Sequence, residues 1–178
     1  MQVGVVVWLA SELMFFSGLF AAYFTLRASA RGPWPPEGAE LEAGAAGLFT
    51  VVLLLSSGTV QLGVRALARG DRAGFRRWLL VTAALALVFL GNQAREWSAA
   101  PFSASSHAFG STFYVLTGFH GLHVAGGVVA MLFLVGRAMH ARFGARPEDA
   151  AAAEVVSYYW HFVDVVWLGM YATLFLLS

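Results

Sequence analysis

Four ionisable side chains interrupt segments that are otherwise apolar: Glu12, His120, His123 and Asp164. A charge or an imidazole at bilayer depth is costly, so such residues usually face the protein interior and mark a function or a specific contact. His120 and His123 are three residues apart, which places them on one face of a helix. Paired imidazoles on helices can bind haem or a metal ion, and buried carboxylates can pass protons or tie helices together.

A second histidine near the C-terminus repeats this spacing, because His161 precedes Asp164 by three residues. A closed metal site needs three or four ligands with supporting partners, and only Glu12 is available at a comparable depth. We therefore favour a structural interpretation, in which each histidine donates a hydrogen bond to a helix carbonyl or a carboxylate. Asp164 would then join two helices through a histidine, with a proton relay as the alternative. The prediction is that this chain binds no metal.

Two other charged residues have more than one possible role. Glu12 has Trp8, Phe15 and Phe16 as helical neighbours and no arginine within a turn. It can bind a lipid headgroup or an ammonium ligand, pass a proton, or hydrogen-bond to a neighbouring helix. Arg137 follows a long apolar run, where its side chain can extend to a lipid phosphate or simply anchor the helix end.

The composition is typical of an integral membrane protein, with 59% apolar and 12% charged residues among 178. A helix needs about 20 apolar residues to cross the hydrocarbon core. Five segments satisfy this length, at residues 3–26, 43–66, 75–94, 107–137 and 151–177. The connections are too short for a soluble domain. The sequence thus predicts an all-α bundle of five transmembrane helices in a single domain, residues 1–178.

Arginine placement predicts the orientation of this bundle. Five arginines flank the connection between the second and third segments, and three flank the connection between the fourth and fifth. The positive-inside rule then places both connections and the N-terminus in the cytoplasm and the C-terminus outside. The first segment carries no preceding positive charge and is too long for a signal peptide, so we expect a retained helix. The absence of cysteine excludes disulfides and thiolate metal sites.

Small residues also recur along the fourth segment, where Thr117, Gly121 and Ala125 are four residues apart. Such stripes allow helix backbones to approach closely in lipid. Packing among the five helices accounts for the stripe, and contact with another subunit is compatible with it.

Three motifs resemble one known family along nearly the whole chain. They are SE at residues 11–12, the run FGSTFY…TGFHGLHV within residues 109–124, and YWHFVDVVW at residues 159–167. The two long motifs resemble the signature of subunit III of haem–copper terminal oxidases, the family of cytochrome c oxidase subunit III. Longer members have seven helices, and this chain resembles the last five. The two helices that it lacks form one arm of a V-shaped lipid cleft in those members.

The resemblance implies an accessory function without a catalytic residue or a cofactor on this chain. In this family haem and copper belong to subunits I and II, and subunit III packs on subunit I. It also holds phospholipids and supports proton uptake and the stability of the complex that reduces O₂ to water. By position, Glu12 matches a buried glutamate of the family and Arg137 matches an arginine linked with lipid phosphate. Five further residues match polar positions of the family that have a structural or proton-related role: His120, His123, Glu154, His161 and Asp164.

This resemblance predicts a multi-pass subunit of the respiratory chain in the bacterial cytoplasmic membrane, with no nucleic-acid partner. Within the family, a quinol oxidase subunit and the subunit associated with nitric oxide reductase are alternatives. Outside the family, a haem-binding electron-transfer protein would use the paired histidines. A small transporter would use Glu12 and Asp164 as coupling carboxylates.

Overall fold

The computed structural model describes residues 2–39, 41–140, 143–144 and 147–177. The described part of the chain contains five α-helices, and a π-helical segment, η1, extends the last of them. Their bounds are α1 Gln2–Ser29, α2 Ala43–Ala68, α3 Arg72–Ala99, α4 Ala108–Arg137, α5 Pro147–Tyr171 and η1 Ala172–Leu176. The prediction of five helices is confirmed.

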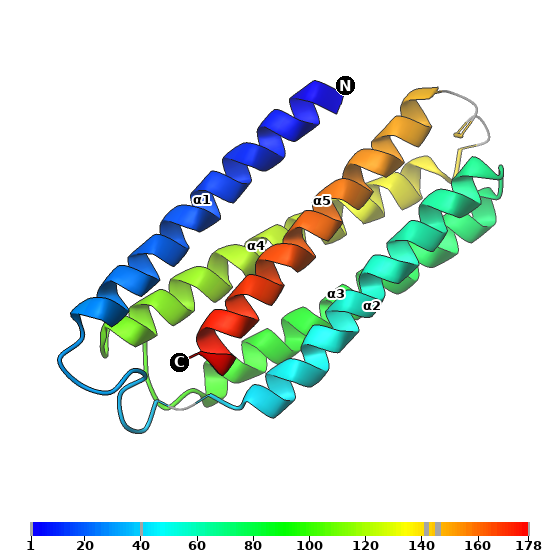
Figure 1. The fold of residues 1–178 in the computed structure, drawn as a ribbon. Helices are drawn as coiled ribbons and strands as arrows, with labels where there is room; N and C mark the ends of the chain where they lie inside the picture. Colours follow the sequence, from blue (N-terminus) through cyan, green and yellow to red (C-terminus); the bar gives the residue numbers. More distant parts are fainter. Residues whose placement is uncertain (1, 40, 141–142, 145–146, 178) are drawn as a thin grey trace.

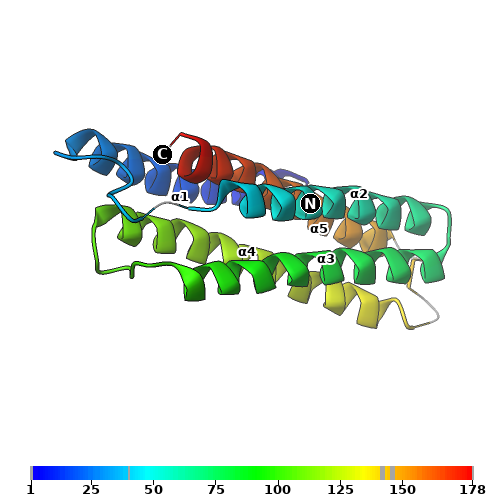
Figure 2. The same cartoon turned by 90° about the horizontal axis from the view of Figure 1, so that it is seen from below.

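The helices run up and down in a flat bundle. Figure 1 shows α1 at one edge, α2 and α3 at the opposite edge, and α4 and α5 between them. Seen from below, α3 and α4 lie under α2 and α5 (Figure 2). The two chain ends lie at opposite ends of the bundle. Helix α1 packs mainly on α4 and only slightly on α5, so most of its surface faces away from the other helices.

Four helices are long and apolar enough to cross a membrane by length and composition: Val3–Ser29, Ala43–Ala68, Arg72–Ala99 and Ala108–Arg137. The first of these spans is almost entirely exposed, with 6% of its window buried. Helix α5 carries Glu148, Asp149, Glu154 and Asp164, and its composition does not meet the same criterion. The length and composition of these four helices support a membrane protein.

Several helix ends differ from the predicted bounds, most of all in α3 and α5. Helix α3 is longer at both ends than the predicted 75–94. Its earlier start is explained by Asp71, whose side chain caps the helix by accepting a hydrogen bond from the Gly74 N–H. Helix α5 begins at Pro147 rather than 151, since proline and acidic residues are compatible with a first helical turn. It ends at Tyr171, and η1 replaces its predicted last turns. His107 lies outside α4 as its cap, where the ring Nδ1 accepts from the Gly110 N–H.

A row of hydrogen bonds fixes α5 on α2. Trp160 Nε1 donates to Ser56 Oγ and Trp167 Nε1 donates to Thr50 Oγ1, each across 2.9 Å. One turn further, Tyr171 donates to the carbonyl of Ala43 across 3.1 Å. All three aromatic residues lie on one side of α5, and both indoles are buried. This row places the polar side chains of α5 in a defined register against α2.

Candidate functional site

The most polar contact of α1 lies where α1, α4 and α5 meet. Glu12 Oε2 lies 3.1 Å from His123 Nε2 on α4, and Glu12 Oε1 accepts from Trp8 Nε1 across 3.2 Å. The ring of Trp8 stacks on Tyr159 of α5 at 5.1 Å, and the Tyr159 hydroxyl donates to the His123 carbonyl across 2.9 Å. Both partners of the acid–imidazole pair are mostly shielded, with 26% of the Glu12 and 17% of the His123 side chain exposed.

Both ring nitrogens of His123 face oxygen atoms. His123 Nδ1 lies 2.6 Å from the carbonyl oxygen of Phe119. A carbonyl only accepts, so Nδ1 carries a hydrogen. The contact at Nε2 then requires one more proton, either on the imidazole facing a carboxylate or on the carboxyl group facing a neutral imidazole. The contact joins α1 to α4.

A second polar cluster joins α5 to α2. The Ser57 hydroxyl of α2 lies against both His161 and Asp164, at 2.7 Å from His161 Nδ1 and in close contact with Asp164 Oδ2. The other side of the His161 ring faces Ser157 Oγ, which donates to Gln61 Oε1 across 3.3 Å. Asp164 is buried, and its Oδ1 has no hydrogen-bond partner among the described residues. The predicted clamp through Asp164 exists, but its partner is a serine rather than a histidine.

His120 has a different environment from the other histidines. Its ring is fully buried, stacks on Trp167 at 4.9 Å and meets the Phe89 ring edge-on at 5.8 Å. Neither ring nitrogen has a hydrogen-bond partner within the described ranges. The prediction that each histidine donates to a carbonyl or carboxylate was therefore wrong for His120, and also for His161, whose ring nitrogens face the hydroxyls of Ser57 and Ser157. His120 and His123 share the spacing of one helix face and both contact α5, but the His120 ring meets Phe89 of α3 whereas the His123 ring pairs with Glu12 of α1.

Arg137 is engaged at the other end of the bundle. Its Nη2 donates to Oδ1 of Asp149 across 2.6 Å, and its guanidinium lies 5.6 Å above the Phe143 ring. Asp149 is buried and also accepts from the Gly144 N–H across 3.0 Å. The carboxylate thus joins the end of α4, the following connection and the start of α5. Sequence reasoning missed Asp149, although acidic residues in the first turn after a helix-starting proline are a recognisable signal.

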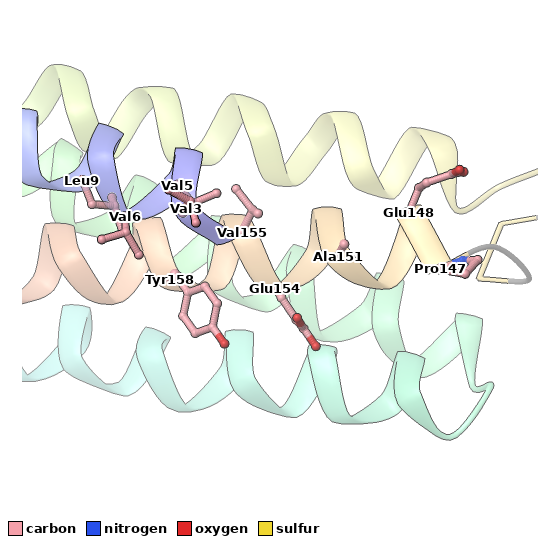
Figure 3. Close-up of a pocket in the computed structure, with 10 residues that line it drawn as sticks. All are labelled: Val3, Val5, Val6, Leu9, Pro147, Glu148, Ala151, Glu154, Val155 and Tyr158. Atoms are coloured by element: carbon pink, nitrogen blue, oxygen red, sulfur yellow. The ribbon is translucent and has the colours of Figure 1, made fainter. Parts of the chain in front are cut away.

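A groove of about 990 Å³ lies between the N-terminal halves of α1 and α5 (Figure 3). The α1 wall is aliphatic, with Val3, Val5, Val6 and Leu9. The α5 wall consists of Pro147, Glu148, Ala151, Glu154, Val155 and Tyr158. Glu154 is exposed here and makes no hydrogen bond or ion pair with a described residue. Among the described residues, no three His, Asp or Glu side chains are grouped so that they could hold a metal ion.

Comparisons with known proteins identify one family for this chain. The family model described as "Cytochrome c oxidase subunit III" matches residues 1–178. A "Probable cytochrome c oxidase subunit 3" of Nocardia farcinica is 50% identical over 98% of this chain and 86% of the relative. The cytochrome c oxidase subunit 3 of Corynebacterium diphtheriae is 43% identical over 99% of this chain and 88% of the relative. That of Thermostichus vulcanus is 38% identical over 98% and 86%.

The match covers the whole chain, including the turns with Glu12, His123 and Asp164, and four helices are suited to a membrane. The chain therefore belongs to the cytochrome c oxidase subunit III family and is a membrane-embedded subunit III of a haem–copper oxidase.

Proposed function

We propose that this chain is the scaffolding subunit of a bacterial cytochrome c oxidase, packing on subunit I in the cytoplasmic membrane beside subunit II. It carries no redox centre, and the haem and copper of the complex belong to its partners. It holds phospholipid and supports proton uptake and the stability of the catalytic subunit. The groove between α1 and α5 carries this proposal, because it gives the chain an apolar recess that its own helices leave open.

All five helices cross the membrane in this proposal, with the N-terminus in the cytoplasm. The groove then opens near the cytoplasmic face, where α1 begins and where α4 is followed by α5. Its aliphatic α1 wall is suited to an acyl chain, since apolar surface in the membrane packs against apolar tails. The carboxylates of Glu148 and Glu154 on the other wall are suited to a headgroup that carries an amine. Arg137, which is half-exposed beside Asp149, can reach a lipid phosphate at the same end.

The acid–imidazole pair gives the proposal a second part. Glu12 and His123 hold one proton at a position shielded by Trp8, Phe16 and Tyr159. A group that retains a proton near the surface of a proton-consuming complex can assist the supply of protons to that complex. The contact between Glu12 and His123 also fixes α1 to α4. His161 and Asp164 are interpreted as structural, because their nearest polar partner is the Ser57 hydroxyl of α2.

The lipid role is tested by filling the groove. Ala151→Trp places a large side chain in the groove, whereas Ala150→Trp alters an exposed neighbouring position that does not line it. The oxidase complex is purified with each variant, and its phospholipids are extracted and counted by mass spectrometry. We expect Ala151→Trp to lower the phospholipid retained per complex and Ala150→Trp to leave it unchanged. Equal lipid content in both variants and the parent would contradict the proposal.

A further inference from the structure

A second groove, of about 460 Å³, lies on the outer face of α3 and α4. Its α3 side includes Gln93, Ala94 and Trp97, and its α4 side includes Gly118 and Gly121. It is separate from the groove between α1 and α5, and none of the polar clusters described above occupies it. The Trp97 indole closes one end by donating from Nε1 to Thr117 Oγ1 across 3.1 Å.

Gln93 gives this groove an unsatisfied hydrogen-bond donor. Only 5% of the residue is exposed, and its Nε2 has no hydrogen-bond partner in the described part of the chain. A buried amide without a partner is unfavourable, and water is scarce inside a bilayer. Because Gln93 lines the groove, a molecule bound there can supply the missing acceptor.

The glycines of the groove are not required by the packing of this chain. A Cβ atom added at Gly121 would meet only Leu90 Cδ2, at 3.8 Å, and one at Gly118 would meet the Trp97 ring at 3.4 Å. Both are ordinary contact distances. Glycine in a helix interior is less favourable than alanine. The space above these glycines is therefore open to something outside the chain.

We propose that the α3–α4 groove binds a transmembrane helix from another subunit of the oxidase, which brings a hydrogen-bond acceptor to the Gln93 amide. This inference rests on the proposed function as an accessory subunit. Helices associate in lipid by close backbone approach at small residues, and glutamine side chains form hydrogen bonds between them. Fluid acyl chains adapt to any apolar surface, so a lipid would not need glycines at these positions. The groove extends over residues 90–97 and 114–122, about 12 Å of helix, which matches the contact made by one crossing helix.

The absence of cysteine from the sequence allows a direct test. Leu122 lines the groove and is 68% exposed, whereas Leu55 of α2 lies outside it and is 61% exposed. Leu122→Cys and Leu55→Cys are introduced singly into an affinity-tagged chain in the full complex, labelled with a photoactivatable maleimide in native membranes, and irradiated. We expect Leu122→Cys to form a crosslink with another oxidase subunit and Leu55→Cys to give about tenfold less of it. Lipid adducts alone at position 122, or equal crosslinking at both positions, would overturn the inference.

A second pair of variants measures the affinity. Gly121→Leu fills the groove, and Gly58→Leu alters an exposed glycine of α2 with no atom within 4 Å of an added Cβ. We expect Gly121→Leu to lower the oxidase subunits recovered with the tagged chain by about tenfold, equivalent to about 1.4 kcal/mol. Unchanged recovery, or equal loss with Gly58→Leu, would contradict the inference while leaving the accessory function intact. If the unaltered chain recovers no other oxidase subunit, the proposed function itself fails.

Discussion

The guanidinium of Arg137 donates to Oδ1 of Asp149 across 2.6 Å and thereby joins the last turn of α4 to the first turn of α5. The two side chains differ in burial, since 43% of Arg137 but only 3% of Asp149 is exposed. Breaking a fully buried ion pair costs about 3–5 kcal/mol, because the remaining charge stays buried without a partner. An arginine that is in contact with solvent or headgroups keeps its charge solvated when its partner is removed. The stability lost on breaking this ion pair therefore depends mainly on the buried Asp149 carboxylate and on the Gly144 N–H from which it accepts a hydrogen bond.

We expect Asp149→Ala to lower the free energy of unfolding by about 1–3 kcal/mol, because the Arg137 guanidinium and the Gly144 N–H both lose their acceptor. The adjacent Glu148→Gln is the matched control, since Glu148 is exposed in the same turn. Thermal unfolding of the two purified variants is compared with that of the parent. Equal melting temperatures for Asp149→Ala and Glu148→Gln would show that the ion pair adds nothing to stability.

The contact between α4 and α5 depends on Gly127. A Cβ atom added there would lie 2.5 Å from Cζ3 and 2.6 Å from Cε3 of the Trp160 ring, which is itself fixed by Ser56. Overpacking of this kind costs about 1–3 kcal/mol. Gly127→Ala should therefore destabilise the protein by this amount. At neighbouring Gly126 the nearest atom is Tyr159 Oη, at 3.7 Å, so Gly126→Ala should be neutral or slightly stabilising. Thermal unfolding of this adjacent pair separates close packing from helix propensity, and a reversed order would contradict the prediction.

Long apolar runs made the helices predictable, whereas polar helix ends did not. Residues 43–66 and 107–137 were placed within two residues of α2 and α4, because their apolar character starts and stops near the helix ends. The start of α5 was missed since Glu148 and Asp149 are not apolar, although they are favourable at a helix N-terminus. Hydropathy indicates which residues lie in the hydrocarbon core. A helix that extends into the polar membrane interface is therefore longer than its apolar run.

The polar partners were harder to predict than the polar residues themselves. Glu12, His123 and Asp164 stood out because ionisable groups are rare at bilayer depth. Ser57, the actual partner of Asp164, belongs to a residue type that is common in membrane helices, and it lies 107 residues away in the chain. His120 and His123 follow one spacing, yet His120 meets Phe89 of α3 and His123 pairs with Glu12 of α1, which depends on how these helices pack around α4. Such pairings are tertiary and cannot be read from spacing within one helix.

Ser57 is expected to be as important for stability as the carboxylate that it contacts. Ser57→Ala removes the hydroxyl from both His161 and Asp164 and leaves a buried carboxyl group without a partner. We expect a loss of about 1–3 kcal/mol. Ser17→Ala is the control, because this exposed hydroxyl bonds only to the Leu13 carbonyl of its own helix. If thermal unfolding shows equal stability for the two variants, Ser57 is not a clamp between α2 and α5.

Glu12 allows the proton to be separated from the contact that holds it. In Glu12→Gln, the amide can donate to a neutral His123 Nε2 and its oxygen can still accept from Trp8, so α1 remains attached to α4. In Glu12→Ala both contacts are lost. We therefore expect Glu12→Gln to assemble like the parent, and Glu12→Ala to lose about 1–3 kcal/mol of stability.

The functional readout for this pair is the lifetime of the oxidase during sustained turnover, measured with the bound phospholipid of the same preparations. Glu12→Gln should shorten that lifetime or alter the lipid content although its melting temperature is unchanged, because only the exchangeable proton and the charge have been removed. Glu12→Ala should change all three quantities, since α1 is then released from its polar contact on α4. A Glu12→Gln complex that matches the parent in lifetime and lipid content would reduce Glu12 to a helix-packing residue and remove the proton from its proposed function.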